Sequence, residues 1–147
     1  MNVKAILAAK SRNLGGDTIT IEPTADLAAA VKLLAGRKIG AVVILGAGGR
    51  LAGILSERDI VRALAEQGAD ALALPVGQVM TRNVMTCSEE DEAAILMERM
   101  TSGKFRHLPV LRGGKLVGVV SIGDVVKERV DAAERESEAL RDYIQTA

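Results

Sequence analysis

Two short segments of the sequence carry the same polar residues at the same spacing. Ser56 is followed three residues later by Asp59, and Ser121 is followed three residues later by Asp124. Each pair follows a short apolar run and precedes an apolar pair, so each is expected where a strand passes into a helix. The free amides and the dipole at the start of a helix favour an anion, and a carboxylate there can accept hydrogen bonds from ribose hydroxyls.

The same spacing is also typical of a capping box. In a capping box, a serine side chain and an acid three residues later satisfy amides that the first turn of a helix leaves unpaired. Capping and ligand binding are compatible, and the residues alone leave both open. The motif occurs twice, each time after a glycine and two aliphatic residues. This repetition favours a binding role in addition to the cap.

The duplication extends well beyond these two motifs. Gly53 and Gly118 are separated by 65 residues, as are the two serines and the two aspartates. Upstream of the glycine turns the offset is 66, because the turn at 46–50 is one residue longer than the turn at 112–115. A length change of this kind belongs in a turn. We therefore expect one repeat at 17–67 and a second at 82–131, too long a period for a solenoid.

Each repeat is predicted to run strand, helix, strand, strand, helix. A β-branched run at 18–21 gives the first strand, and apolar strands at 41–45 and 51–55 flank a glycine-rich hairpin turn. We expect Gly36 and Gly103 to end the first helix of each repeat. The second helix begins after Ser56, and its spacing predicts that three residues face the core: Ile60, Val61 and Leu64.

Three further segments flank or join the repeats. Residues 1–16 are predicted to form an N-terminal helix and lead-in, and residues 68–81 a packed linker with a short helix. Residues 132–147 extend the last helix. Its apolar stripe fits either a helix lying on its own core or a helix facing a partner in a homodimer. The stripe comprises Val126, Val130, Ala133, Leu140 and Ile144, with Ser137 at the skipped position.

Composition excludes several classes of function. The formal net charge is zero, which argues against nucleic-acid binding, since that needs clustered cations. Cys87 and His107 are the only residues of their types, so the sequence offers no disulfide, no structural zinc site and no evident nucleophile–base pair. No apolar run is long enough to span a membrane. We expect a cytoplasmic protein that is not an enzyme and has no catalytic residues and no metal.

The repeated phrases resemble those of a tandem pair of cystathionine-beta-synthase (CBS) domains, known as a Bateman module. The resemblance covers about residues 14–131, most of the chain. Each phrase is weak alone, but together they are specific. They are Gly53-Ile54-Leu55-Ser56-Glu57-Arg58-Asp59-Ile60, Gly118-Val119-Val120-Ser121-Ile122-Gly123-Asp124-Val125, Arg106-His107-Leu108-Pro109-Val110 and Val79-Met80-Thr81-x-x-Val84.

The resemblance implies an α/β (α+β) fold in which two β-α-β-β-α repeats pack sheet to sheet with pseudo-twofold symmetry. It also implies two clefts for adenosine ligands such as AMP, ATP, NAD-type cofactors or S-adenosylmethionine. Ribose would contact Asp59, Asp124, Ser56 and Ser121. The base would lie against largely backbone positions at Ile19, Thr20, Ile21, Gly40, Ala41, Val84, Met85 and Thr86. Candidate cations for the phosphates are Arg58, Lys104, Arg106 and His107.

The two halves do not match the pattern equally. The first repeat has Gly40-Ala41 where the second has Arg106-His107, and it has Arg58 where the second has Gly123. The expected function is a stand-alone regulatory or energy/redox sensor with an adenine nucleotide as regulatory ligand, no required cofactor and an unknown effector protein. The alternative is a dimerisation or scaffold module whose clefts are vestigial.

Overall fold

The computed structural model describes residues 1–14 and 18–146. The expected end of the lead-in and start of the first repeat, at residues 15–17, and the last residue of the C-terminal extension lie outside the described residues. The chain divides into two compact units. The first-repeat unit contains β1 through Thr86 together with Leu111–Val117. The second-repeat unit contains α1, Cys87–Val110 and the chain from Gly118 onward.

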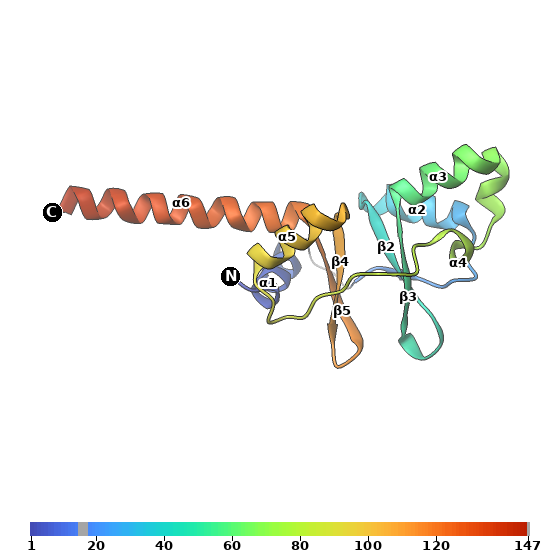
Figure 1. The fold of residues 1–147 in the computed structure, drawn as a ribbon, viewed down its shortest axis with the longest axis horizontal. Coiled ribbons are helices and arrows are strands. Elements are labelled where there is room, and N and C mark those ends of the chain that lie inside the picture. The colour runs from blue at the N-terminus through green and yellow to red at the C-terminus, as the bar shows by residue number, and fades with distance from the viewer. Residues whose placement is uncertain (15–17, 147) are drawn as a thin grey trace. The chain divides into compact units, whose positions relative to one another are not determined.

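The first repeat has the predicted order of elements (Figure 1). A three-stranded sheet has the order β1-β2-β3, with β1 parallel to β2 and β2 antiparallel to β3. Two helices, one before β2 and one after β3, complete the repeat. The bounds are β1 (Thr20–Ile21), α2 (Leu27–Arg37), β2 (Ala41–Leu45), β3 (Leu51–Ser56) and α3 (Glu57–Gln67), with a 3-10 turn η1 (Ala47–Gly49) in the hairpin.

An aliphatic core holds this unit together. Leu27 and Leu34 of α2, Ile44 of β2 and Leu55 of β3 are all at most 5% exposed. On α3 the buried positions are Ile60 and Ala63, whereas Val61 is 65% exposed and Leu64 is 37% exposed. The prediction that Val61 and Leu64 face the core was therefore wrong. The inward face of α3 is centred on Asp59, Ile60 and Ala63 instead.

The first helix of the second repeat ends at Gly103 as predicted, whereas that of the first repeat ends at Arg37, one residue after Gly36. The left-handed C-cap positions are occupied by Lys38 (φ 54°) and Lys104 (φ 57°), which are equivalent in the repeat. A left-handed cap usually carries glycine because a side chain is strained there. Both repeats accept that strain at a lysine, one or two residues beyond the glycine.

The segment that connects the repeats is packed rather than extended away from the domain. It contains η2 (Gly68–Ala73) and α4 (Val76–Val79), and both Ala71 and Val76 are fully buried. Beyond α4, Thr81 forms an antiparallel bridge with Ile54 of β3. The predicted packed linker with a short helix is thus what residues 68–81 form.

The second repeat comprises α5 (Ala93–Gly103), β4 (His107–Arg112), β5 (Lys115–Ser121) and α6 (Ile122–Thr146). Its predicted first strand is reduced to one parallel bridge between Cys87 and Val110, and Val84, Met85 and Thr86 form no strand. The reason lies at Pro109, which stands where the first repeat has Val43. Proline has no amide to donate to a neighbouring strand, so the ladder stops after one bridge.

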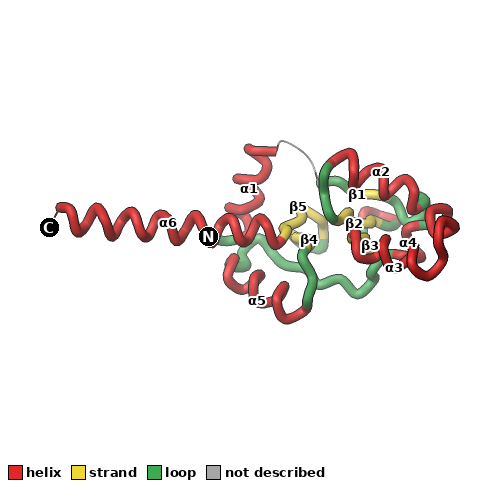
Figure 2. Tube along the Cα trace, turned by 90° about the horizontal axis from the view of Figure 1, so that it is seen from above, coloured by secondary structure: helices red, strands yellow, loops and turns green. Residues whose placement is uncertain are grey.

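The N-terminal helix α1 (Val3–Leu14) packs in the second-repeat unit. The amides of Val3 and Lys4 donate to the carbonyl oxygens of Asp91 and Glu89, at 2.9 and 3.0 Å. Val3 and Ile6 are buried, so one face of the predicted N-terminal helix packs on this unit. Figure 2 shows α1 and α5 on either side of the start of α6. Among the helices of the described residues, none has the length and apolar character needed to cross a membrane.

Candidate functional site

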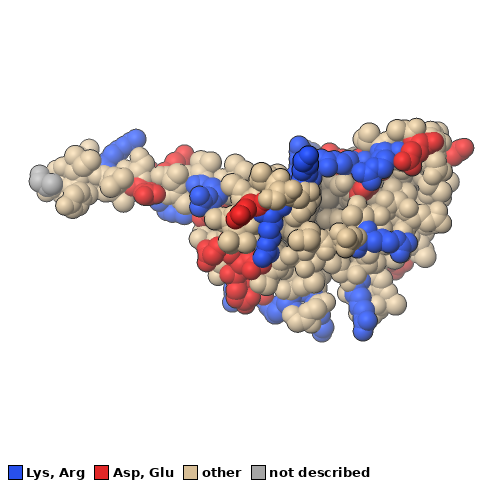
Figure 3. Space-filling model, in the orientation of Figure 1, with Lys and Arg blue, Asp and Glu red and all other residues tan. Residues whose placement is uncertain are grey.

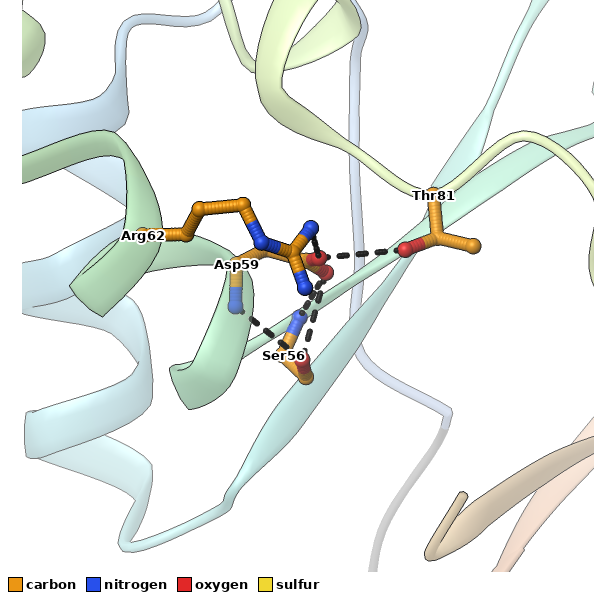
Figure 4. A network of polar contacts seen from close by, with 4 residues as sticks. All are labelled: Ser56, Asp59, Arg62 and Thr81. Carbon is orange, nitrogen blue, oxygen red and sulfur yellow. Dashed lines mark hydrogen bonds and ion pairs between the residues drawn. The ribbon is translucent and has the colours of Figure 1, made fainter. Parts of the chain in front are cut away.

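Ser56 and Asp59 form a capping box at the start of α3 (Figure 4). The amide of Asp59 donates to Ser56 Oγ at 3.4 Å, and the amide of Ser56 donates to Asp59 Oδ2 at 3.0 Å. The serine hydroxyl also donates to the same carboxylate oxygen at 3.2 Å. The structural role predicted for this motif is therefore confirmed. The cap also places the carboxylate at the positive end of the α3 dipole.

Two residues outside the motif complete the surroundings of Asp59. Thr81 Oγ1 donates to Asp59 Oδ1 at 3.1 Å, and Arg62 Nη1 approaches the same oxygen at 3.5 Å. Asp59 is only 4% exposed, whereas the Arg62 side chain is 59% exposed. Both carboxylate oxygens thus have protein partners. A ligand hydroxyl that binds Asp59 must share these oxygens with Thr81 and Arg62 or displace them.

Ser121 and Asp124 make the equivalent cap at the start of α6. The amide of Asp124 donates to Ser121 Oγ at 3.1 Å, and the amide of Ser121 donates to Asp124 Oδ2 at 2.8 Å. The additional partner here is Lys10 of α1. Its ammonium group donates to Asp124 Oδ2 and to the carbonyl oxygen of Val119, both at 2.9 Å. The second aspartate is therefore paired with a full positive charge.

The pKa of Asp124 lies below its ordinary value. Burial disfavours the charged carboxylate and by itself would raise the pKa. Hydrogen bonds from the Ser121 amide and from the Lys10 ammonium group, together with the lysine charge, outweigh that effect. Asp124 is consequently ionised at neutral pH and remains an acceptor for hydroxyl groups.

The start of the second strand of each repeat, here called the strand entrance (Gly40-Ala41 or Arg106-His107), lies next to the capping box of that repeat. The amide of Glu57, the first residue of α3, donates to the Gly40 carbonyl oxygen at 3.1 Å. In the second repeat the amide of Ile122 donates to the Arg106 carbonyl oxygen at 2.8 Å. The fold therefore brings the predicted positions Gly40-Ala41 and Arg106-His107 beside the Ser–Asp pairs of their own repeats.

The remaining predicted positions are more scattered. Arg58 is exposed on the first turn of α3, and Lys104 is exposed at the C-cap of α5. Arg106 is also exposed, and His107 is half-buried as the first residue of β4. Ile19 directly precedes β1, and Thr20 and Ile21 pair with Val43 and Ile44 of β2. Val84, Met85 and Thr86 lie in irregular chain, and the Met85 side chain is 53% exposed.

Two hollows lie within the first-repeat unit. One, of about 220 Å³, is lined by Asp59 and Arg62 together with residues of the connecting segment, among them Gln78 and Val79. The other, of about 650 Å³, lies between α2 and α3 and includes Gly40 and Glu57 in its lining. The aspartate of the first repeat and its neighbouring strand entrance thus both border open space.

Lys10, Arg62 and Thr81 were missed as site residues by the sequence analysis. A signal for Lys10 was present, because it continues the helical spacing of Val3 and Ile6 and so places a charge on a packing face. Thr81 had no comparable signal, since its contact with Asp59 joins residues 22 positions apart. Local pattern carries no information on such a pairing.

Cys87 is a buried residue with a protonated thiol. Burial raises its pKa to about 11, and the Asp91 carboxylate acts in the same direction. At neutral pH the thiol is therefore a poor nucleophile. In the part of the chain that the structure describes, no three His, Cys, Asp or Glu side chains gather in a way that could hold a metal ion.

The family profile described as "CBS domain" matches this sequence at residues 12–66 and again at 76–131. The chain belongs to the CBS domain family. Each match contains one Ser–Asp capping box and the strand entrance beside it. The resemblance suggested by the repeated phrases is confirmed, as is the mixed helix-and-strand fold of the two repeats.

Other CBS domain proteins resemble this one over most of its length. A CBS-domain containing protein from Agrobacterium tumefaciens, ATU1752, has a TM-score of 0.82 and 45% identity, covering 88% of this chain and 99% of its own. The CBS domain protein PAE2072 from Pyrobaculum aerophilum, solved in complex with AMP, has a TM-score of 0.77 and 26% identity, with 93% and 99% covered. The mitochondrial CBS domain-containing protein CBSX3 of Arabidopsis thaliana is 31% identical over 97% of this chain and 71% of its own length.

Proposed function

We propose that this tandem CBS pair binds an adenosine nucleotide and acts as a regulatory or energy/redox sensor. The observation that carries the proposal is the duplicated cap, which sets an aspartate at the start of a helix in both repeats. An ionised carboxylate there can accept hydrogen bonds from ribose hydroxyls, while helix amides and nearby cations attract phosphate. AMP in the related PAE2072 structure supports the same ligand class.

Each predicted residue has a role in this proposal. Asp59 and Asp124 accept the ribose hydroxyls, with Ser56 and Ser121 beside them. The starts of the second strands, Gly40-Ala41 and Arg106-His107, lie next to the caps and border the ligand. Their backbone groups bind the base together with residues 19–21 and 84–86. The candidate partners for phosphate are Arg58, Lys104, Arg106 and His107, three of which lie in the connection between α5 and β4 or at its edge.

The proposed output is conformational rather than chemical. A ligand that prefers one arrangement of the two repeats shifts the population of the protein toward that arrangement. We place the protein in the cytoplasm as a homodimer that signals to a separate effector protein, without nucleic acid, membrane or required cofactor. The candidate ligands are AMP, ATP, NAD-type cofactors and S-adenosylmethionine.

A specific observation favours a second function, that of a dimerisation or scaffold module without a ligand. Both aspartates already have protein partners, namely Thr81 and Arg62 at Asp59 and Lys10 at Asp124. A carboxylate whose oxygens are satisfied gains less from a new hydroxyl than a free one does. The two functions differ in one measurable property, which is affinity for an adenosine ligand.

Isothermal titration calorimetry and thermal shift with a panel of the four ligand classes test the proposal. A ligand at 100 times its dissociation constant stabilises the protein by about 2.7 kcal/mol, which is readily detected. Asp59→Asn and Asp124→Asn keep an oxygen for the cap but lose the charge. Because a hydrogen bond to a charged group contributes about 1.5–3 kcal/mol, each should weaken binding in its own repeat at least about tenfold.

Asp26→Asn is the matched control. Asp26 caps α2 by accepting from the Ala29 amide at 2.8 Å, but it belongs to neither Ser–Asp motif. The Asp26→Asn substitution removes one capping charge from the first-repeat unit but no predicted ligand contact. Affinity for the adenosine ligand should therefore be unchanged. Circular dichroism of all three variants separates lost binding from lost folding. If no adenosine ligand binds at millimolar concentration, the sensor proposal is wrong and the scaffold function is favoured.

A further inference from the structure

The C-terminal part of α6 is a helix that its own unit does not cover (Figure 1). Val125 and Glu128, near the start of α6, are at most 8% exposed, and they fix the helix to its unit. From residue 133 to residue 146 every position is exposed. Large apolar side chains are nevertheless present there, with Leu140 57% exposed and Ile144 71% exposed. A single helix presenting such side chains to water is a surface that calls for a partner.

All the exposed large aliphatic residues of α6 follow one stripe, which we call the α6 stripe; the exposed Tyr143 lies beside it. Successive members are separated by four, three, four, three and four residues, the alternation of the a and d positions of a coiled coil. At 100° per residue, the stripe lies roughly 130° around the helix from the face that carries Val125 and Glu128. The helix can therefore dock on its own unit and still offer the stripe outward. Its members are Val126, Val130, Ala133, Ser137, Leu140 and Ile144.

The charges beside the stripe discriminate between the two orientations of a second copy (Figure 3 shows both signs along α6). In a parallel pair in register, Arg129 faces Glu134 of the other copy, and Glu136 faces Arg141. All of these contacts are attractive. In an antiparallel pair that covers the whole stripe, Glu134 faces Glu134 of the other copy and Glu136 faces Glu136 of the other copy, so both contacts are repulsive.

A staggered antiparallel pair avoids those repulsions but covers only part of the stripe. It leaves either Leu140 and Ile144 or Val126 and Val130 in water. The parallel pair alone covers every apolar position with opposite charges on both sides. We infer that two copies of this chain associate through the α6 stripe as a parallel, in-register coiled coil.

This inference is independent of nucleotide binding, and it specifies a surface and an orientation for the proposed homodimer. The seam spans less than three heptads and includes Ala133 and Ser137, so it is a weak one. A polar residue at an a position fixes register at a cost in stability. We therefore expect the dimer to dissociate on dilution.

Sedimentation velocity of the full chain over a range of concentrations tests the interface. The wild type should approach twice the mass of one chain as concentration rises. Leu140→Glu with Ile144→Glu, which places four like charges in the seam of the pair, should leave a monomer at every concentration. The matched control is Ala139→Glu with Gln145→Glu, which adds the same two charges to exposed positions off the stripe. It should dimerise as the wild type does.

Oxidative cross-linking tests the orientation. In the parallel register Ser137 faces Ser137 of the other copy, so Ser137→Cys should form a disulfide-linked dimer. Ala139→Cys, two residues away and off the stripe, should not. Native Cys87 is 6% exposed and is common to both variants, so it serves as the background. A wild-type monomer, or a dimer that survives the two glutamates in the stripe, would overturn the interface. A stripe-dependent dimer that fails to cross-link at residue 137 would overturn the parallel orientation.

Discussion

The two repeats hold equivalent aspartates with different chemical groups. Asp59 receives a hydrogen bond from the neutral hydroxyl of Thr81, which lies in the segment connecting the repeats. Asp124 receives one from the ammonium group of Lys10, which lies in the N-terminal helix. The two capping boxes are otherwise alike. The duplicated sequence thus preserved the acid and its cap, while the group that contacts the acid from outside the repeat diverged.

The equivalence extends to the segments that supply these groups. In the first repeat, Pro75 forms an antiparallel bridge with Asp26, and Thr81 pairs with Ile54. In the second, Asn2 forms the corresponding bridge with Glu92. The carbonyl oxygen of Val119, equivalent to Ile54, accepts a hydrogen bond from Lys10. The N-terminal segment therefore does for the second repeat what the connecting segment does for the first.

The two segments differ in how they approach their repeats. The connecting segment approaches Gly53 with backbone, and a Cβ atom there would lie 2.7 Å from the Thr81 carbonyl oxygen and 2.6 Å from Met80 Sδ. The N-terminal helix approaches Gly118 with a side chain, and a Cβ atom there would lie 2.7 Å from Leu7 Cδ2. Backbone contact is rigid, whereas the end of a leucine can rotate away. The first repeat should tolerate change at this position less well than the second.

The largest expected effect follows from this contrast. Gly53→Ala should lower the free energy of unfolding by about 1–3 kcal/mol, because the added methyl group forces backbone or the buried part of Met80 to move. Gly118→Ala should cost less, because Leu7 can move and because alanine restricts the unfolded chain. Urea denaturation of both variants measures the difference.

The double variant Leu7→Ala with Gly118→Ala serves as the control for this comparison. Removing the leucine side chain relieves the contact, so the two substitutions should cost less together than the sum of their separate effects. Equal costs for Gly53→Ala and Gly118→Ala would show that the two segments approach their repeats with the same rigidity. That result would contradict the comparison.

A smaller effect distinguishes the neutral partner from the charged one. Lys10→Met and Thr81→Val each remove one hydrogen bond to an aspartate and should each cost about 1 kcal/mol. Salt screens the ion pair but not the hydroxyl contact. The loss of unfolding free energy caused by Lys10→Met should therefore be smaller in 1 M sodium chloride than in low salt. The loss caused by Thr81→Val should be the same in both. The same response for both variants would contradict the assignment.

The pH dependence gives the same comparison a second readout. The pKa of Asp124 is lower in the folded protein than in the unfolded chain, so its ionisation stabilises the fold above the unfolded pKa, about 3.9. That stability is lost as the pH falls through the folded pKa. The deficit of Lys10→Met should accordingly be complete at neutral pH and disappear as the pH falls below about 4. A deficit that persists undiminished in acid would place the role of Lys10 in packing and in its hydrogen bond to the Val119 carbonyl oxygen rather than in the ion pair.

Local features of the fold were predictable from sequence because they depend on neighbouring residues. The order of strands and helices follows from apolar periodicity, and both capping boxes follow from the Ser–Asp spacing. The left-handed caps at Lys38 and Lys104 are local departures from the glycine rule and have no structural explanation. Other errors have long-range causes, because Pro109 ends a ladder with a segment more than twenty residues away. The partners of the two aspartates likewise come from other elements, Lys10 from 114 residues away.

The smallest effect at neutral pH is expected at Cys87, which occupies the position of Ile21 in the first repeat. The Cys87 amide donates to the Pro109 carbonyl oxygen at 3.0 Å, and a substitution preserves that bond. Because the two side chains are similar in size, Cys87→Val should change the free energy of unfolding at pH 7 by less than about 1 kcal/mol.

Alkaline pH should separate Cys87→Val from the wild type. The folded thiol has a pKa of about 11, whereas an unfolded thiol titrates near 8.5. Above pH 9 the unfolded chain ionises and the folded protein does not, so the wild type should lose stability relative to the variant, by about 2 kcal/mol near pH 10. Urea titrations at pH 7 and pH 10 measure both values. Parallel curves for the two proteins would mean that the thiol titrates normally. The single bridge between Cys87 and Val110 would then open readily enough to expose the thiol to water.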